Sequence, residues 1–236
     1  FGEVAALIAI FLFAISYEQT QFSLFLNHPS LAIISVLIFY FGLSYWIFRK
    51  KIWGFYIALL GLGLSIQFEF VEIQLIAVFL LFLLIFRKHT AGVKLKNIFI
   101  GLLFLLIPLS SYIISEIKHD FLILKQIPEV FGNALTPSTG NKLSNFIFVL
   151  NRHIYDNFAS NNIIVIVLGI MFLAVFVTLI IKEVSKKELL FLMLWFGGGF
   201  LVYLFINNDA YFYNTGTSIA LLIFAAFMLS KLYSLN

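Results

Sequence analysis

Long runs of apolar residues recur along the whole chain and are separated by polar connections. A helix rises about 1.5 Å per residue, so about 20 apolar residues cross the roughly 30 Å of hydrocarbon in a bilayer. The runs predict eight membrane-spanning helices, at residues 3–17, 30–48, 52–68, 70–86, 97–114, 162–181, 189–206 and 217–231. The third and fourth runs are short and separated only by Phe-Glu-Phe, so a re-entrant pair is the alternative there.

Composition excludes an ordinary soluble domain. Of the 236 residues, 62% are hydrophobic and 11% are charged, whereas about 25% are charged in a typical globular protein. We therefore expect an all-α integral membrane protein, a bundle of about eight transmembrane helices. The apolar runs recur, so the first is not merely a signal sequence. Because Phe1 already lies in an apolar stretch, we expect residues 1–236 to be a single transmembrane domain that lacks its N-terminal helices.

The basic residues predict an orientation for this bundle. If the eight runs alternate in direction, eleven of the fifteen Lys and Arg residues lie on one side: Arg49, Lys50, Lys51, Arg87, Lys88, Lys94, Lys96, Lys182, Lys186, Lys187 and Lys231. Positive charge is enriched on the cytoplasmic side of membrane proteins. This pattern predicts a multi-pass protein of the cytoplasmic (inner) membrane. The net charge of +4 reflects orientation, and no basic cluster on a polar domain indicates nucleic-acid binding.

A long polar segment, residues 115–161, falls on the opposite, external side. It contains two apolar stretches, 121–131 and 143–158, whose spacing suits helices lying in the membrane interface. Loops of this length are usually functional or disordered. We expect this one to be ordered and to cover a site. Within the bundle, Gly61 and Gly63 predict close packing between helices.

Three stretches, in this order, resemble one family. They are "AISYEQTQFSLFLNHPSLAIISVLIFYFGL", "GLGLSIQFEFVEIQLIAVFLLFLLIFRK" and "IGLLFLLIPLSSYIISEIKHDF". They look like helices of the polyprenyl-phosphate-sugar-dependent membrane glycosyltransferases with the GT-C fold, the protein O-mannosyltransferase-like group (glycosyltransferase family 39). The resemblance covers residues 5–121. The sequence departs from the family pattern at Tyr17, where Pro is common, and at Leu24, where a basic residue often stands.

The resemblance implies transfer of a sugar from a polyprenyl phosphate to an acceptor hydroxyl at the outer face of the membrane. The partners would be the lipid bilayer, the lipid-linked donor and a protein, lipid or glycan acceptor. In the family the catalytic carboxylate stands in an external loop that would lie upstream of Phe1, so the catalytic base is unknown here. The transfer needs cationic or metal help for the phosphate leaving group, so a divalent metal ion is one expected cofactor.

The candidate site residues are polar side chains expected near the outer surface. As substrate or lipid-phosphate contacts we select Gln67, Glu69, Glu116, Lys118, His119, Asp120 and Arg152. Glu69 is also the candidate metal ligand, because it interrupts an apolar hairpin where a bare loop would suffice. Charged residues at the end of a span are also ordinary for any membrane helix.

Other polar residues have simpler interpretations. Glu18, Gln19 and Gln21 are predicted to form the solvated face of an external segment, and Glu72 to be solvated. His153 is either a phosphate or acceptor contact or part of the loop structure.

Other functions remain open at this point. A transporter or lipid-linked saccharide flippase would place ionisable residues near the middle of the membrane, whereas here nearly all lie near the ends of the runs. A polysaccharide polymerase or ligase would also have many helices and a large external loop. A noncatalytic homologue is the remaining alternative.

Overall fold

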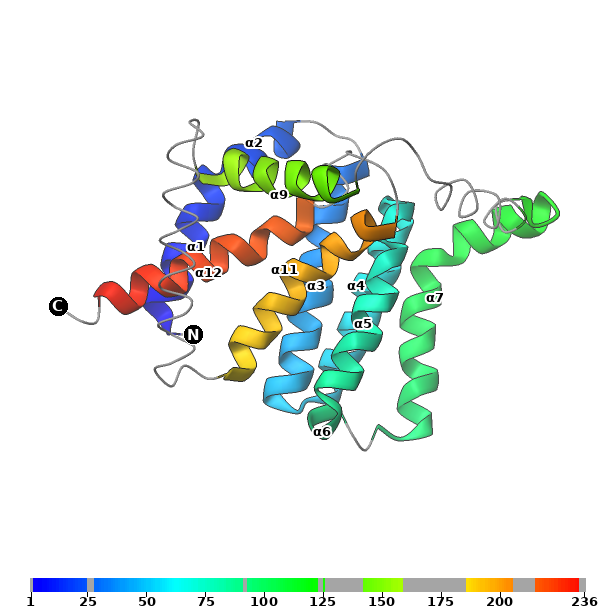
Figure 1. Ribbon diagram of the computed structural model, residues 1–236. Helices are drawn as coiled ribbons and strands as arrows, with labels where there is room; N and C mark the ends of the chain where they lie inside the picture. Colours follow the sequence, from blue (N-terminus) through cyan, green and yellow to red (C-terminus); the bar gives the residue numbers. More distant parts are fainter. Residues whose placement is uncertain are drawn as a thin grey trace.

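In the computed structural model, all regular secondary structure in the described residues is helical (Figure 1). The structure describes residues 2–24, 28–90, 93–122, 125, 142–158, 186–205 and 215–233. The helices are α1 (Glu3–Ile15), α2 (Tyr17–Leu24), α3 (His28–Arg49), α4 (Ile52–Phe68), η1 (Phe70–Ile73), α5 (Gln74–Ile85), α6 (Arg87–Thr90), α7 (Leu95–Lys118), α9 (Lys142–Phe158), α11 (Lys186–Phe205) and α12 (Thr215–Tyr233).

Helices α3 and α4 form a tightly packed hairpin. Lys50, in the left-handed backbone region with φ of 53°, turns the chain between them. A Cβ atom added at Gly61 would collide with the backbone of Phe39, and one at Gly42 with the backbone of Ala58. Glycine is therefore required on both helices because the backbones nearly touch. The predicted role of Gly61 in helix packing is confirmed.

Helix α7 packs against α4 along its first half and then leaves the bundle. A Cβ atom at Gly63 would collide with the carbonyl oxygen of Leu105 on α7, which also confirms the predicted packing at Gly63. Pro108 lies inside α7, and such a proline removes a helical hydrogen bond and bends the helix. Figure 1 shows α7 changing direction, so its last turns extend away from the other helices.

Aromatic rings from α3, α5 and α11 fill the centre of the bundle. Tyr40 stacks on Trp195 with 4.3 Å between ring centroids, and Phe82 lies 4.9 Å from Phe191. The indole Nε1 of Trp195 donates a hydrogen bond of 3.1 Å to the carbonyl of Gly216, at the start of α12. Trp195 thus connects three helices while its one polar atom is satisfied, as buried indoles require.

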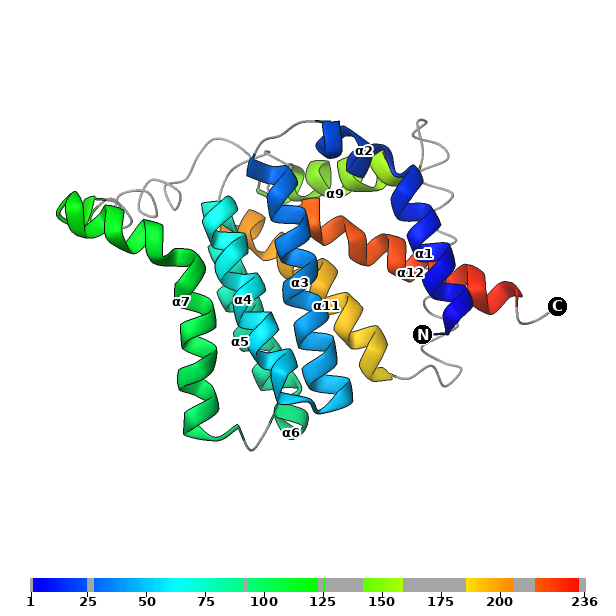
Figure 2. The same cartoon turned by 180° about the vertical axis from the view of Figure 1, so that it is seen from behind.

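Helices α2 and α9 lie across one end of the bundle. Figure 2 shows α2 and α9 at the end where α1 meets α2, above α12 and beside the upper end of α3. Helix α9 contacts α2, α11 and α12. The predicted helix within residues 143–158 is confirmed as α9.

Helices occur at seven of the eight predicted spans. Within the described residues two helices are long and apolar enough to cross a bilayer, Ser30–Arg49 and Leu95–Lys118. The other apolar helices are shorter: α1 has 13 residues and α4 has 17. The predicted span 162–181 lies outside the described residues, as does much of the predicted loop 115–161.

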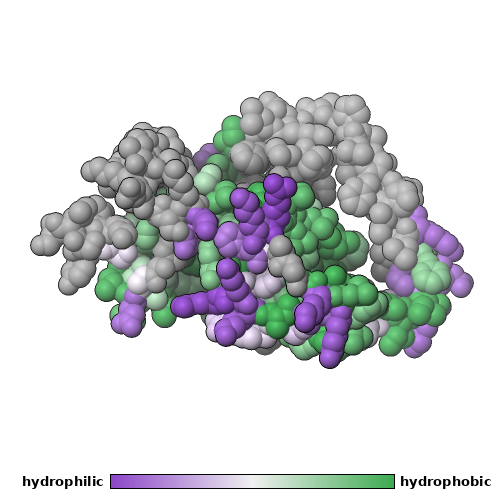
Figure 3. All heavy atoms as spheres, turned by 90° about the horizontal axis from the view of Figure 1, so that it is seen from below, coloured by the Kyte–Doolittle hydropathy of each residue, from purple (hydrophilic) through white to green (hydrophobic). Residues whose placement is uncertain are grey.

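Basic residues gather at the end of the bundle opposite α2 and α9. The α3–α4 turn carries residues 49–51, α6 carries Arg87 and Lys88, and α11 begins with Lys186 and Lys187. Figure 3, which views this end, shows hydrophilic side chains gathered among apolar ones. Seven of the eleven residues predicted to share one side therefore lie at one end, and Lys182 lies outside the described residues.

Candidate functional site

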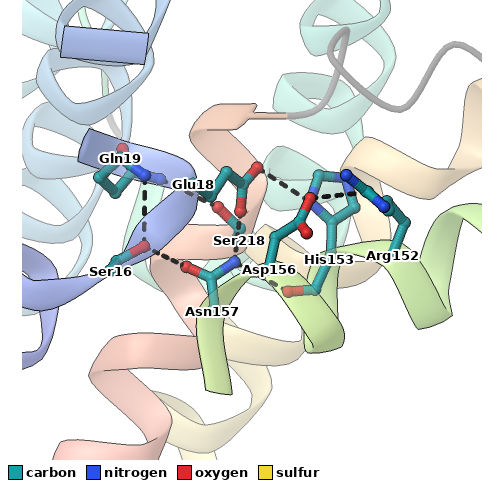
Figure 4. A network of polar contacts seen from close by, with 8 residues as sticks. All are labelled: Ser16, Glu18, Gln19, Arg152, His153, Asp156, Asn157 and Ser218. Carbon is teal, nitrogen blue, oxygen red and sulfur yellow. Dashed lines mark hydrogen bonds and ion pairs between the residues drawn. The ribbon is translucent and has the colours of Figure 1, made fainter. Parts of the chain in front are cut away.

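A buried polar cluster lies where α2, α9 and α12 meet (Figure 4). Its buried members are Ser16, Glu18, Gln19, His153, Asp156 and Ser218. Asn157 is half-buried among them, and Arg152 lies at the edge. In a chain this apolar, such a concentration of buried polar groups is exceptional, because each would cost free energy if it lacked a partner.

Ser16 fixes the direction of Glu18. Its backbone is extended, with φ of −62° and ψ of 126°, and it separates α1 from α2. Its hydroxyl accepts a hydrogen bond of 3.3 Å from the backbone N–H of Gln19, the pattern of a helix N-cap. The new helix starts in a different direction from α1, and its first turn directs Glu18 and Gln19 inward. Tyr17 and Leu24 of the same helix are exposed.

Helix α9 buries one face against the protein. Val149, His153 and Asp156 recur at helical spacing and are buried. Ile147 and Phe148 are exposed by 46% and 52%, and the polar residues Ser144 and Asn151 are also exposed. The buried face of α9 therefore carries polar as well as apolar side chains.

The carboxylate of Glu18 is the centre of the network. Its Oε1 lies 3.0 Å from Nδ1 of His153, and the two side chains are only 1% and 0% exposed. Its Oε2 accepts a hydrogen bond from Nδ2 of Asn157. A carboxylate that is ionised can only accept, so in that state of Glu18 the donor is Nδ1 of His153.

Hydrogen bonds to neighbouring helices hold these three side chains. The hydroxyl of Ser16 donates to Oδ1 of Asn157 at 2.6 Å, and Nδ2 of Asn157 also donates to the carbonyl of His153 at 2.8 Å. Nε2 of Gln19 donates to the hydroxyl of Ser218 on α12 at 3.2 Å. Three separate helices are therefore linked by one polar network.

An ion pair between Arg152 and Asp156 lies at the edge of the cluster, and the partly exposed guanidinium of Arg152 is the positive charge there. Nε of Arg152 lies 2.8 Å from Oδ2 of Asp156, and their side chains are 39% and 4% exposed. Burial raises the pKa of the Asp156 carboxyl above its ordinary value, and the nearby Glu18 adds to this, while Arg152 acts in the opposite direction. The guanidinium of Arg152 also lies 5.8 Å from the centroid of the Tyr155 ring.

The cluster combines an acceptor, a proton-transfer group and a cation within one small volume. Carboxylate and imidazole groups in contact can move a proton at neutral pH. Amide and hydroxyl groups suit the hydroxyls of a sugar, and a partly exposed guanidinium suits a phosphate. The same network also joins α2 to α9, so part of its role is structural.

The structure separates the residues selected from the sequence into three places. Arg152 belongs to the buried cluster. Gln67, at the end of α4, accepts a hydrogen bond of 2.9 Å from the hydroxyl of Ser111 on α7, and the half-buried Glu69 follows it in the α4–α5 connection.

The third place is the end of α7. Glu116 is half-buried there, whereas Lys118, His119 and Asp120 are exposed. Nδ1 of His119 lies 2.8 Å from the carbonyl of Ser115, one turn earlier. Figure 1 shows this end of α7 beyond the side of the bundle, well away from α2 and α9. These residues therefore lie at the end of a helix, at a distance from the buried cluster, and their contact with a substrate stays a prediction.

Three predictions of solvated side chains were wrong. Glu18 is 2% exposed, Gln19 is 6% exposed and Glu72, in η1, is 4% exposed. Glu18 is buried because α9 covers it, a contact between segments about 135 residues apart. Gln19 is buried against Ser218 of α12. The spacing of His153 and Asp156 on one face of an amphipathic segment was the available signal, since it indicated a polar face in need of a partner.

Among the described residues, no group of three or more His, Cys, Asp or Glu side chains is placed to hold a metal ion. The prediction of a divalent ion at Glu69 stays a prediction.

The fold and cluster define a helical protein with apolar outer surfaces and a buried polar centre at one end. No protein-family model, curated protein or solved structure matches the chain.

Proposed function

We propose that this protein is a multi-pass membrane glycosyltransferase that moves a sugar from a polyprenyl-phosphate donor to an acceptor hydroxyl. The observation that carries the proposal is the buried Glu18–His153–Asn157 network at one end of an otherwise apolar bundle. The resemblance of residues 5–121 to the GT-C glycosyltransferases supports the same chemistry.

The apolar surface supports the membrane location. Among the most apolar residues of α7, only 6% are buried. The side chains of Leu103, Ile107 and Phe99 are exposed by 59%, 65% and 61%. A soluble protein rarely exposes a continuous apolar surface of this kind. Lipid in contact with α7 would cover it.

The separation of charge supports an orientation in the cytoplasmic membrane. The basic end around residues 49–51 would face the cytoplasm under the positive-inside rule. The end that α2 and α9 cover would then face outward, where lipid-linked sugars and acceptors meet. Glu18 on α2 and Asp156 on α9 lie at that end.

Within the proposal, the cluster residues bind and orient substrate. Arg152, whose side chain is 39% exposed, would neutralise charge on the donor phosphate, and the buried contact between Glu18 and His153 would hold α9, and with it Arg152, in position. Holding the reacting groups in place supplies a large share of the rate in such transfers. The base that accepts the acceptor proton is not assigned to any of these residues.

The test is transfer of labelled sugar by the full-length protein in membranes, from a panel of polyprenyl-phosphate sugars. Glu18→Gln should lower kcat/KM by about 100-fold, the scale expected when a bound group is misplaced. Glu3→Gln, which changes an exposed carboxylate on α1, is the matched control and should leave transfer unchanged. Thermal unfolding of both variants separates lost folding from lost activity.

Two outcomes would redirect the proposal. Transfer from no donor would favour the flippase, polymerase or noncatalytic alternatives, and lipid-flipping assays would follow. Glu69→Gln tests the second group of candidates, since normal turnover in that variant would remove Glu69 from the site.

A further inference from the structure

A groove of about 500 Å³ lies between α3 and α11 and reaches α12. It is distinct from the polar cluster, because it lies at the basic end of the bundle, near the end of α3 and the beginning of α11. Its lining includes Phe48, Arg49, Glu188, Phe191, Trp195 and Ile223. Volumes of 300 to 1,000 Å³ are typical of small-molecule sites.

The groove is polar at one end and apolar along its length. Arg49 is in the last turn of α3 and Glu188 in the first turn of α11, so both charges lie at the end of the bundle. Phe191 and Trp195 follow Glu188 by about one and two helical turns, which places them progressively deeper. The groove therefore has a charged mouth and an aromatic interior. This combination suits a lipid whose headgroup lies at Arg49 and Glu188 and whose acyl chain lies beside Trp195.

The two charges at the mouth have no ion-pair partner within the described part of the chain. Arg49 is exposed and forms no ion pair there with Glu188. The Oε2 atom of Glu188 is buried and has no hydrogen-bond partner among the described residues. A buried carboxylate oxygen without a donor is costly, so a ligand that brings a hydrogen-bond donor to Glu188 would be favoured.

The surroundings favour a phosphate near Arg49. Lys50 and Lys51 follow Arg49 directly, and Nζ of Lys187 lies 3.2 Å from Nε2 of His89 on α6. Basic pockets between helices on the cytoplasmic side of membrane proteins bind phosphate headgroups. An anionic headgroup without an ammonium, however, would place negative charge beside Glu188 and bring it no positively charged donor.

We propose that this groove binds an aminophospholipid, a lipid whose headgroup carries both a phosphate and a primary ammonium. The phosphate contacts Arg49, the ammonium donates to Glu188, and one acyl chain lies along Phe48, Phe191 and Trp195. The occupant is zwitterionic, so it complements the cation and the carboxylate together. The inference rests on the proposed membrane location but not on glycosyl transfer.

Lipid binding to the purified full-length protein, measured by native mass spectrometry, tests the proposal. The probes are phosphatidylethanolamine, phosphatidylglycerol and phosphatidylcholine with the same acyl chains. The wild-type protein should bind phosphatidylethanolamine about fivefold more tightly than phosphatidylglycerol, the factor for one ion pair near the surface. It should also prefer it over phosphatidylcholine, whose quaternary ammonium has no N–H to donate to Glu188.

Variants assign the preference to the two residues. Glu188→Gln should abolish the preference for phosphatidylethanolamine over phosphatidylglycerol, and Arg49→Gln should weaken binding of both lipids. Lys96→Gln, an exposed cation at the same end but on α7, should behave as wild type. Equal binding of the two lipids by the wild-type protein, or a preference that survives in Glu188→Gln, would overturn the proposal. Labelling experiments on membrane orientation are independent of this result.

Discussion

His153 contacts Glu18 at 3.0 Å across 135 residues of chain, with both side chains almost fully buried. The contact joins α9 to the first turn of α2. Because α9 exposes Ile147 and Phe148 and buries His153 and Asp156 beside Val149, polar contacts contribute to its attachment to the bundle. A helix held in this way should be sensitive to single polar substitutions.

We first predict an energetic coupling between these two residues. Glu18→Gln would place a second amide N–H₂ group against the donors of His153 and Asn157, and His153→Gln would disturb the same bond. Each variant should lower the free energy of unfolding by about 1–3 kcal/mol, the cost of an unsatisfied buried group. The double variant should lose less than the sum, by about 0.5 kcal/mol or more. Equilibrium unfolding in detergent micelles measures all three, and additive losses would contradict direct coupling.

A second prediction concerns the α3–α4 contact. Gly61→Ala adds a methyl group where the Phe39 backbone already lies, so the helices must separate. We expect a loss of about 1–3 kcal/mol in stability, the usual cost of overpacking. Gly197→Ala on α11 is the control, because a Cβ atom there meets nothing within 4 Å. Alanine has the better helix propensity, so this control should be neutral or up to about 1 kcal/mol more stable. Similar Tm values for the two variants would argue against the close contact.

The third prediction is a dependence of stability on pH at Asp156. Burial raises the pKa of this carboxyl in the folded protein, while the unfolded chain has an ordinary value of about 3.9. Below the unfolded value both states bind the proton and the burial has no cost. As the pH rises, the unfolded state loses its proton first, so stability falls until the pH passes the raised pKa of the folded state.

Asp156→Asn cannot ionise and isolates this effect. Its stability relative to wild type should increase as the pH rises from about 4 and then level off above the raised pKa. Tm values of the two proteins across this range provide the measurement. A difference that is constant with pH would show that Arg152 compensates the burial completely.

The positions of the helices could be predicted from the sequence because they depend on local apolar runs. The predicted spans 30–48 and 97–114 coincide with α3 and α7, and the packing roles of Gly61 and Gly63 follow from the missing Cβ atom at a helix surface. Length and composition determine such features within one segment. They need no knowledge of which segments meet.

The polar cluster could not be predicted in the same way, because it depends on which segments meet. Glu18 lies in a segment with low mean hydropathy, which predicts a solvated surface. Nothing within that segment indicates that α9 covers Glu18. Among the selected residues, only Arg152 lies in the cluster, because the others were chosen for their position at the ends of spans. In a membrane protein the polar face of a short helix can point inward as readily as toward water.

The last prediction tests the proposed orientation by labelling single introduced cysteines. The chain contains no cysteine, so a single introduced thiol is the only one to react. Lys51 and Lys118 are both exposed, at the α3–α4 turn and at the end of α7. If the basic end faces the cytoplasm, Lys118→Cys should react with a membrane-impermeant maleimide in intact cells, and Lys51→Cys only after permeabilisation.

Both positions are charged, exposed and close to a helix end, so each serves as the control for the other. The reverse pattern would invert the orientation and place the Glu18 cluster on the cytoplasmic side. Labelling of both positions in intact cells would contradict a location of the two ends on opposite sides of a membrane.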